Sequence, residues 1–450
     1  MAMTQLRPPR ADQSRPGQHR AGLTALAGAA FVYVTAETLP IGLVPQLSAG
    51  LHVRPGTVGL LVTVYAAVAG LSAVPLTAAL EHRSRRQVVV GCVAVLALSQ
   101  FVIAVAPGYP VVMAARIVCA LTHGVFWSML APVAARLVAP GQGGRATALV
   151  FTGNSVALVL GVPLGTALGH LIGWRPTMAA LGAVAVLSAV ALRRALPTLP
   201  ALSLPAARPP QTAPSLAPAP LADAGQSSLR ARLVAVPAAL RSAPLLAICV
   251  VTVLVVTGHF TAYTYITALV HRDAGLAGLA LSAVLFGYGA AGVAGIWLVG
   301  RTTDRRPRAA AAACAVGVVV ALIGLVTVAR GSVVATVAAM VVWGAAFTAL
   351  PVCLQGAVLR VAPRSTDTAS ALFVVAFQIG IGGGALAGSL LVDAGELSAL
   401  CVTGAALAAA GLLVVLAARR AFPPPAPSAP SATRRAFRTA CSTLRRSSSG

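Results

Sequence analysis

Two charged side chains lie deep inside the long apolar segments of this 450-residue sequence. Glu37 is the only carboxylate deep within such a segment, and Arg116 lies within another. Apolar surroundings disfavour an ionised carboxyl group, so Glu37 can take up a proton from one side of a membrane and release it to the other. A permanent cation such as Arg116 can favour the ionised form of a neighbouring carboxyl group or bind backbone carbonyls. Proton exchange is one interpretation; the alternative is that Glu37 caps a helix break before Pro40 and Arg116 clamps a neighbouring helix.

Two histidines, His123 and His259, lie in further apolar segments, and a histidine can titrate near neutral pH. Tyr263 and Tyr265 follow His259 and give that helix polar groups on aromatic bodies. These residues indicate substrate contacts or a pH-sensitive role, and the alternative is hydrogen-bonded packing. Single histidines on different helices do not make a metal site, so we expect no metal and no other cofactor.

The composition is that of a membrane protein. Hydrophobic residues make up 58% of the chain and charged residues 9%, whereas about a quarter of the residues in a soluble domain are charged. All 33 basic residues are Arg, so the chain has no P-loop lysine and ATP-driven transport is excluded. The motifs G-x-S-x-G and H-E-x-x-H are absent as well, and nothing else suggests an enzyme. The seven cysteines stand singly and indicate packing.

Twelve apolar segments are long enough to cross a bilayer, which takes about 20 residues of helix. They lie at 22–46, 57–80, 87–106, 110–137, 146–171, 176–197, 244–270, 277–300, 308–329, 333–359, 367–392 and 398–418. The sixth and seventh are separated by a Pro-, Ala- and Ser-rich stretch that can form neither a span nor a packed core. We therefore predict an all-α membrane protein with six-helix bundles at 21–197 and 244–418, a linker at 198–243, and disordered tails at 1–20 and 419–450.

The arginines are distributed very unevenly between the two sides of the predicted topology. The tails, the linker and alternate loops carry 28 of them, the other loops carry four, and Arg116 lies within a span. Because positively charged loops stay in the cytoplasm, both termini and the linker are predicted to be cytoplasmic. This clustering between spans also argues against nucleic-acid binding, despite the net charge of +24.

The two halves share sequence features. A shift of 219 residues aligns glycines spaced by four in the fifth and eleventh spans: Gly161, Gly165 and Gly169 with Gly380, Gly384 and Gly388. A shift of 220 aligns Arg85 and Arg86 with Arg305 and Arg306. Small residues four apart let helices approach closely, and Pro163 bends the fifth span. Together with Gly153, these residues predict a hinge in a parallel-repeat transporter, and the alternative is close packing alone.

Five stretches resemble a known family. They are AETLPIGLVPQLSAGLHV at 36–53, ARIVCALTHGVFW at 115–127, GNSVALVLGVPLG at 153–165, TAYTYI at 261–266 and GRTTDRR at 300–306. The pattern resembles the major facilitator superfamily over roughly 22–418, and within it the twelve-span drug:proton antiporters of the arabinose-efflux-permease-like and chloramphenicol-exporter branch. Cys119 and Ala120 stand where drug exporters have Gln-Gly, and the His123-Gly124 form resembles the sugar-efflux branch.

The resemblance implies roles for particular residues. Glu37 would exchange the proton and Arg116 would tune it. The first, fourth, seventh and tenth spans would line a substrate cavity with His123, Trp127, His259, Tyr263, Tyr265, Trp343 and Gln355. The fifth span resembles the antiporter motif, although Val162 replaces a glycine of that motif. The segment after the eighth span resembles a cytoplasmic gate motif, with Gly300, Asp304, Arg305 and Arg308 as its matching residues.

The expected function is export of a small, drug- or antibiotic-like molecule in exchange for protons by a monomeric, multi-pass protein of the cell membrane. Its expected partners are the small-molecule substrate, protons and the lipid bilayer. Two alternatives remain: a sugar or metabolite exporter of the same fold, and a membrane sensor that transports nothing. The direction of transport follows from the resemblance alone, because one architecture serves both directions.

Overall fold

The computed structural model describes residues 16–80, 83–138, 143–197, 241–302, 306–362 and 366–423. Within them, twelve helices are long and apolar enough to cross a membrane, and no strand is present. The first half contains α1 (Pro16–Gly42), α2 (Val44–Leu51), α3 (Pro55–Ala79), α4 (Arg85–Ala104), α5 (Tyr109–Arg136), α6 (Gly143–Val156), the π-helical turn η1 (Ala157–Gly161), α7 (Val162–Leu171) and α8 (Trp174–Ala195). The second half contains α10 (Ala243–Tyr263), α11 (Ile266–Ala274), α12 (Gly278–Thr302), α13 (Pro307–Thr327), α14 (Val333–Val361), α15 (Thr366–Asp393), α16 (Leu397–Ala417) and the short helix η3 (Arg419–Ala421). The predicted all-α membrane fold is confirmed.

The helices begin and end close to the predicted positions. α1 starts at Pro16, so residues 16–20 are helical rather than part of the predicted tail. α10 starts at Ala243, at the end of the predicted linker, most of which lies outside the described residues. The same holds for most of the two predicted tails.

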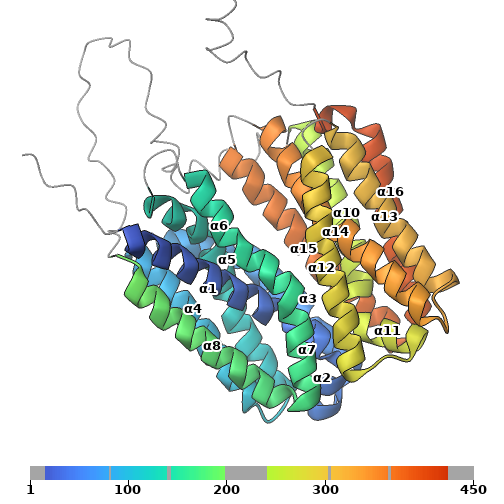
Figure 1. The fold of residues 1–450 in the computed structure, drawn as a ribbon, viewed down its shortest axis with the longest axis horizontal. Helices are drawn as coiled ribbons and strands as arrows, with labels where there is room; N and C mark the ends of the chain where they lie inside the picture. Colours follow the sequence, from blue (N-terminus) through green and yellow to red (C-terminus); the bar gives the residue numbers. More distant parts are fainter. Residues whose placement is uncertain are drawn as a thin grey trace, which may run out of the picture.

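The two halves have the same internal packing, as their sequence similarity predicts. α1 packs against α6, η1 and α7, and α10 packs in the same way against α15. α3 packs against α5 as α12 packs against α14, and α4 packs against α8 as α13 packs against α16. Figure 1 shows the two bundles beside each other, the first from blue to green and the second from yellow to red. The parallel repeat is therefore present in three dimensions.

The repeated glycines lie where helices of one half touch. A Cβ atom on Gly161 would lie 2.6 Å from Oγ1 of Thr35 on α1, and one on Gly380 would lie 2.6 Å from Cβ of Val256 on α10. Real Cβ atoms essentially never come within 3.0 Å of another heavy atom. The glycines of the fifth and eleventh spans are thus needed for close packing within each half.

The first and seventh spans are each broken once. The break between α1 and α2 falls at Leu43 (φ −111°, ψ 10°), and the break between α10 and α11 falls at Tyr265 (φ −116°, ψ 26°). Pro45 helps to explain the first break, because a proline cannot donate the helical hydrogen bond. The two breaks have nearly the same backbone geometry and are 222 residues apart, so they are equivalent positions of the repeat.

Contacts between the halves concentrate at one end of the molecule. We call this the far end, and it holds α2 and α11 (Figure 1). We call the opposite end the terminal end, and α1, α6, α10 and α15 begin there (Figure 1). α3 packs along α15, and α12 packs along η1 and α7. At the far end, the Gly56 backbone N–H donates to Oδ1 of Asp393 at 3.0 Å, and the Tyr265 hydroxyl donates to the carbonyl of Gly56 at 3.4 Å. The ribbons of the two bundles diverge toward the terminal end (Figure 1).

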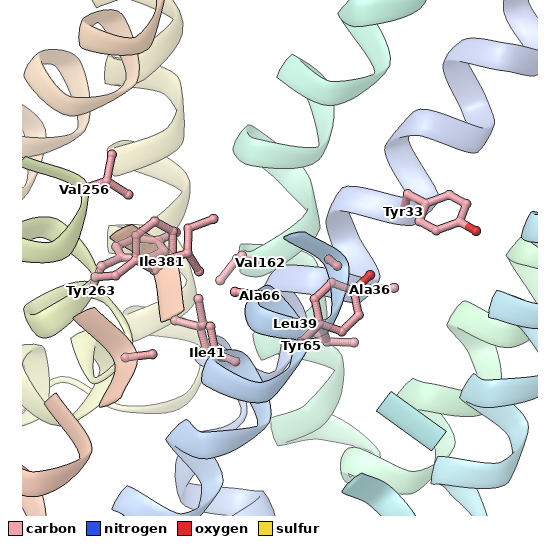
Figure 2. Close-up of a cluster of buried hydrophobic side chains, with 14 of the residues drawn as sticks. Tyr33, Ala36, Leu39, Ile41, Tyr65, Ala66, Val162, Val256, Tyr263 and Ile381 are labelled. Carbon is pink, nitrogen blue, oxygen red and sulfur yellow. The ribbon is translucent and has the colours of Figure 1, made fainter. Parts of the chain in front are cut away.

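Apolar side chains fill the junction nearer the middle of the molecule. Figure 2 shows Ile41, Ala66 and Val162 of the first half on the side that faces Tyr263 and Ile381 of the second, and all five belong to the buried hydrophobic core. A Cβ atom on Gly382 of α15 would lie 3.5 Å from Cβ of Ala66 on α3. The two halves are therefore in direct apolar contact at this depth.

Candidate functional site

Glu37 lies in a buried group of polar side chains contributed by α1, α3 and α5. Its Oε2 is 3.9 Å from Nε2 of His123, and the two side chains are 17% and 8% exposed. On the other side of the imidazole, Nδ1 of His123 is 3.0 Å from the hydroxyl of the buried Tyr65. A phenol and an imidazole are thus hydrogen-bonded to each other, and a carboxyl group lies beside the imidazole at ion-pair distance. We call Glu37, His123 and Tyr65 the first triad.

Arg116 binds the backbone of α1 next to the first triad. Its Nη1 donates to the carbonyl of Ala36 at 2.6 Å, and its Nη2 donates to the carbonyl of Glu37 at 3.2 Å. In a regular helix the carbonyl of Ala36 would accept from the N–H of residue 40, but that residue is Pro40 and has no N–H. The guanidinium therefore replaces the hydrogen bond that the proline removes.

The position of Arg116 bears on both interpretations of its role. It makes the clamp to backbone carbonyls that the sequence left open as the alternative. Its guanidinium carbon also lies 4.3 Å from the ring centre of Tyr65, which is the range of a cation–π contact. Arg116 thus clamps the backbone of α1 and also lies beside the first triad. An influence of Arg116 on the protonation of Glu37 remains a prediction.

Tyr65 and Tyr33 are members of this site that the sequence did not single out. The Tyr33 hydroxyl is 3.0 Å from Oγ1 of Thr122, and its ring stacks on Phe126 with ring centres 4.1 Å apart. Both tyrosines are among the largest fully buried side chains of the molecule. The sequence could have pointed to these two residues. The chain has only six tyrosines, and a tyrosine in the middle of a span needs a hydrogen-bond partner for its hydroxyl.

The predicted cavity residues of the second half form a separate aromatic cluster. His259 on α10 stacks on Phe347 of α14 with ring centres 3.3 Å apart, and on Tyr263 at 4.7 Å. Trp343 lies 5.3 Å from His259, measured between ring centres, and is fully buried. The structure therefore brings His259, Tyr263 and Trp343 together, as the prediction requires, but not next to His123.

The other predicted cavity residues have different surroundings. Trp127 lies 6.1 Å from His123 between ring centres and extends the first site along α5. Tyr265 lies at the helix break and contacts Gly56 of the other half, so it belongs to the junction at the far end. Gln355 donates from Nε2 to Oγ of Ser370, which joins α14 to α15. No group of three or more His, Cys, Asp or Glu in the described part of the chain could hold a metal ion.

The fifth span contains a π-helical turn that the sequence did not reveal. The turn η1 ends at Gly161, two residues before Pro163, and it packs against α1 and also against α12 of the other half. A π turn accommodates an extra residue in the helix and often occurs at functional sites. The matching part of α15 has no proline and is a regular α-helix. The predicted flexing of the fifth span would thus occur at a boundary between the halves.

The gate motif is only partly visible. Asp304 and Arg305 lie outside the described residues, and Gly300 lies near the end of α12, where an added Cβ atom would meet nothing within 4 Å. Arg308 donates to the carbonyls of Val415 and Leu416 at the end of α16. Arg86 donates likewise to the carbonyl of Arg193 at the end of α8. In this state Arg308 thus caps a helix of its own half, and its role in a gate remains a prediction.

Sequence comparison places these features in a family context. A family model described as Major Facilitator Superfamily matches residues 26–385. Two chloramphenicol efflux pumps of Mycobacterium tuberculosis, from the strains CDC 1551 / Oshkosh and ATCC 25618 / H37Rv, are each 37% identical to this chain over 377 residues. The match covers 82% of this chain and 86% of each pump.

Solved structures share the fold at much lower sequence identity. A bacterial homolog of the human lysosomal transporter Spinster matches with a TM-score of 0.67 and 15% identity, covering 91% of this chain and 97% of that one. The peptide transporter POT in complex with alafosfalin matches with a TM-score of 0.68 and 12% identity, covering 89% and 95%. These likenesses concern the arrangement of the helices.

Proposed function

Because the chain belongs to the Major Facilitator Superfamily, we propose that it exports a small, drug-like molecule by alternating access and takes up protons in return. Membership in this family makes it a membrane transporter rather than an enzyme. The observation that carries the proposal is the first triad, in which the only carboxylate deep in a span meets a histidine and a tyrosine. The efflux direction rests on the relatives, which are named chloramphenicol efflux pumps.

The proton would be held by the Glu37 and His123 pair. Protonation of either partner changes the charge between α1 and α5, next to the contact that Arg116 makes with α1. Since the carboxylate is partly exposed while the imidazole and the phenol are buried, Glu37 is the member that exchanges protons with water. His123 and Tyr65 stabilise it in one protonation state or the other.

Alternating access would be a rocking of the two bundles about the junction between them. The contacts across the junction at the far end join the halves on that side, and the distribution of arginines predicts that the terminal end faces the cytoplasm. The described state is then closed toward the outside. Opening there would require α3 to separate from α15 at this end, and α12 from α7, which are the main contacts between the halves among the described residues.

Transport in everted membrane vesicles tests the proposal. Vesicles that contain the protein are expected to accumulate chloramphenicol when an acid-inside pH gradient is imposed, and a protonophore is expected to abolish the accumulation. Labelled arabinose serves as the second substrate, since its accumulation in place of chloramphenicol would favour the sugar exporter. Gradient-independent flux would contradict proton coupling, and the absence of flux for every compound would favour the sensor.

The contact between Asp393 and Gly56 provides a test of rocking. Asp393 accepts from the N–H of Gly56 at the start of α3, where a carboxylate also interacts favourably with the helix dipole. Asp393→Ala is expected to shift the population toward opening of the far end about twofold to fivefold. Spin labels on Arg54→Cys and Ala394→Cys, both exposed at the far end, would report this as a longer distance.

Two further variants make this measurement specific. Asp393→Asn keeps an acceptor oxygen without the charge and is expected to have an intermediate effect. Glu396→Ala removes an exposed carboxylate from the same end of the second half and is expected to leave the distances as in wild type. Identical distance distributions in Asp393→Ala and wild type would show that this contact does not help to close the far end.

A further inference from the structure

The aromatic cluster of the second half contains three polar groups that the proposed proton exchange does not use. They belong to His259 on α10, Tyr288 on α12 and Trp343 on α14, which we call the second triad. The ring of Trp343 lies 5.3 Å from that of His259 and 5.8 Å from that of Tyr288, measured between ring centres. Tyr263 and Phe347 pack against the same rings.

Two members of the second triad are repeat counterparts of members of the first. Leu43 and Tyr265 occupy the equivalent helix breaks, and the residues six positions before them are Glu37 and His259. Tyr65 and Tyr288 each stand ten residues after the first residue of their helix, α3 and α12. By the same measure, His123 stands fourteen residues after the first residue of α5 and corresponds to Phe347 on α14, and Trp343 lies one helical turn before Phe347.

The two triads differ in how their polar atoms are satisfied. In the first, Tyr65 bonds His123, which lies beside Glu37. In the second, Nδ1 of His259, the hydroxyl of Tyr288 and Nε1 of Trp343 are buried and have no hydrogen-bond partner among the described residues. A buried polar group without a partner is costly, and the usual explanation is a function or a ligand that satisfies it. Three such groups around one aromatic cluster point to a ligand.

The chemistry of the second triad limits what that ligand is. An indole N–H only donates, a phenol can donate, and an imidazole can do either, so the triad matches a molecule with hydrogen-bond acceptors. The only charged residues of α10, α12 and α14 are Arg301 and Arg360, near the terminal ends of α12 and α14. An ionised ligand would therefore be buried without a counter-charge, at high cost. The surrounding rings favour an aromatic body.

We propose that the second triad binds the hydrogen-bond acceptors of an uncharged aromatic substrate, while the first triad handles the proton. This inference rests on the proposed function and divides its two tasks between the two halves. Tyr288 becomes a specificity-determining residue, since its hydroxyl recognises the acceptor while its ring belongs to the packing. Tyr288→Phe removes that hydroxyl and leaves the ring in place.

Equilibrium binding of chloramphenicol to the purified full chain tests this division without a proton gradient. Tyr288→Phe is expected to weaken binding about tenfold, the effect of one lost hydrogen bond to the ligand. Tyr109→Phe is the matched control: its hydroxyl donates to the carbonyl of Thr57, away from both triads, and wild-type affinity is expected. Thermal melting of each variant shows whether it is folded. Tetraphenylphosphonium, an aromatic cation, is expected not to displace chloramphenicol.

Several outcomes would overturn the inference. They are wild-type affinity in Tyr288→Phe, an equal loss of affinity in Tyr65→Phe, displacement by the cation, and no binding of chloramphenicol to the wild-type chain. None of them by itself refutes proton-coupled transport, which the vesicle experiment measures separately. Conversely, the wild-type protein could bind chloramphenicol in a way that depends on Tyr288 and yet show no gradient-driven flux. That result would support substrate binding by the second triad and contradict proton-coupled transport.

Discussion

Glu37→Gln is expected to reduce gradient-driven export of chloramphenicol to the level of vesicles without the protein. Gln has nearly the shape of Glu and keeps the polar contact with His123, but it cannot take up or release a proton. The bundles can still rock in this variant, so exchange of labelled for unlabelled substrate without a pH gradient is expected to persist. Loss of driven export together with retained exchange is the signature of a coupling residue.

The control for this experiment is Glu396→Gln. Glu396 is exposed at the N-terminus of α16, so its neutralisation changes the charge of the protein equally without touching the first triad. It is expected to export at the wild-type rate. Gradient-driven export by Glu37→Gln equal to that of wild type would leave Glu37 with a structural role only, in the last turns of α1 before the break at Leu43.

The sequence predicted the elements of the fold well because the bilayer imposes a simple rule. Twelve apolar segments of sufficient length became twelve helices, since a helix is the simplest way to satisfy the backbone in lipid. The glycines four residues apart correctly indicated an internal repeat, because close helix packing has few other solutions. Glu37, Arg116 and His123 could be singled out because polar groups are rare in such segments.

What the sequence did not reveal depends on contacts between helices. The break at Tyr265 has no proline, and the π turn before Pro163 keeps the hydrophobic pattern intact, so neither left a clear local signal. The partnership of Glu37 with His123 and Tyr65 requires the relative rotation of three helices. The sequence alignment with a shift of 220 paired Arg86 with Arg306. In the structure, Arg86 and Arg308 are each the second residue of their helix, α4 and α13, and each donates to the end of a neighbouring helix, α8 or α16. The equivalent pair is therefore Arg86 and Arg308, a shift of 222.

Gly384→Ala is expected to disrupt the second half far more than Gly383→Ala, although the two residues are neighbours on α15. A Cβ atom on Gly384 would lie 2.8 Å from Cβ of Phe260 and 2.9 Å from the backbone N of Thr261, and backbone atoms cannot move aside cheaply. On Gly383 the nearest atom would be 3.7 Å away, an ordinary contact. Overpacking of this kind costs about 1–3 kcal/mol. A clearly lower melting temperature is expected for Gly384→Ala only.

The first half offers the same comparison with residues of two touching helices. A Cβ atom on Gly153 of α6 would collide with the carbonyl of Ala27 on α1, whereas one on Gly28, the next residue of α1, would meet nothing within 4 Å. Gly153→Ala is expected to lower the melting temperature and Gly28→Ala to leave it unchanged or raise it, because Ala favours helix over Gly. Equal melting temperatures for each pair would contradict the packing described here.

These pairs also separate the two roles proposed for the glycines. All the glycine contacts just described lie within one half, so rocking of the bundles leaves them intact. If the glycines serve close packing alone, a substitution is expected to reduce transport only as far as it reduces the amount of folded protein. A hinge predicts more: folded Gly161→Ala protein would retain substrate binding yet transport slowly, because Gly161 ends the π turn that touches both α1 and α12. If transport per folded molecule stays at the wild-type rate in this variant, the fifth span does not flex there, and the movement is confined to the surfaces between α3 and α15 and between α7 and α12.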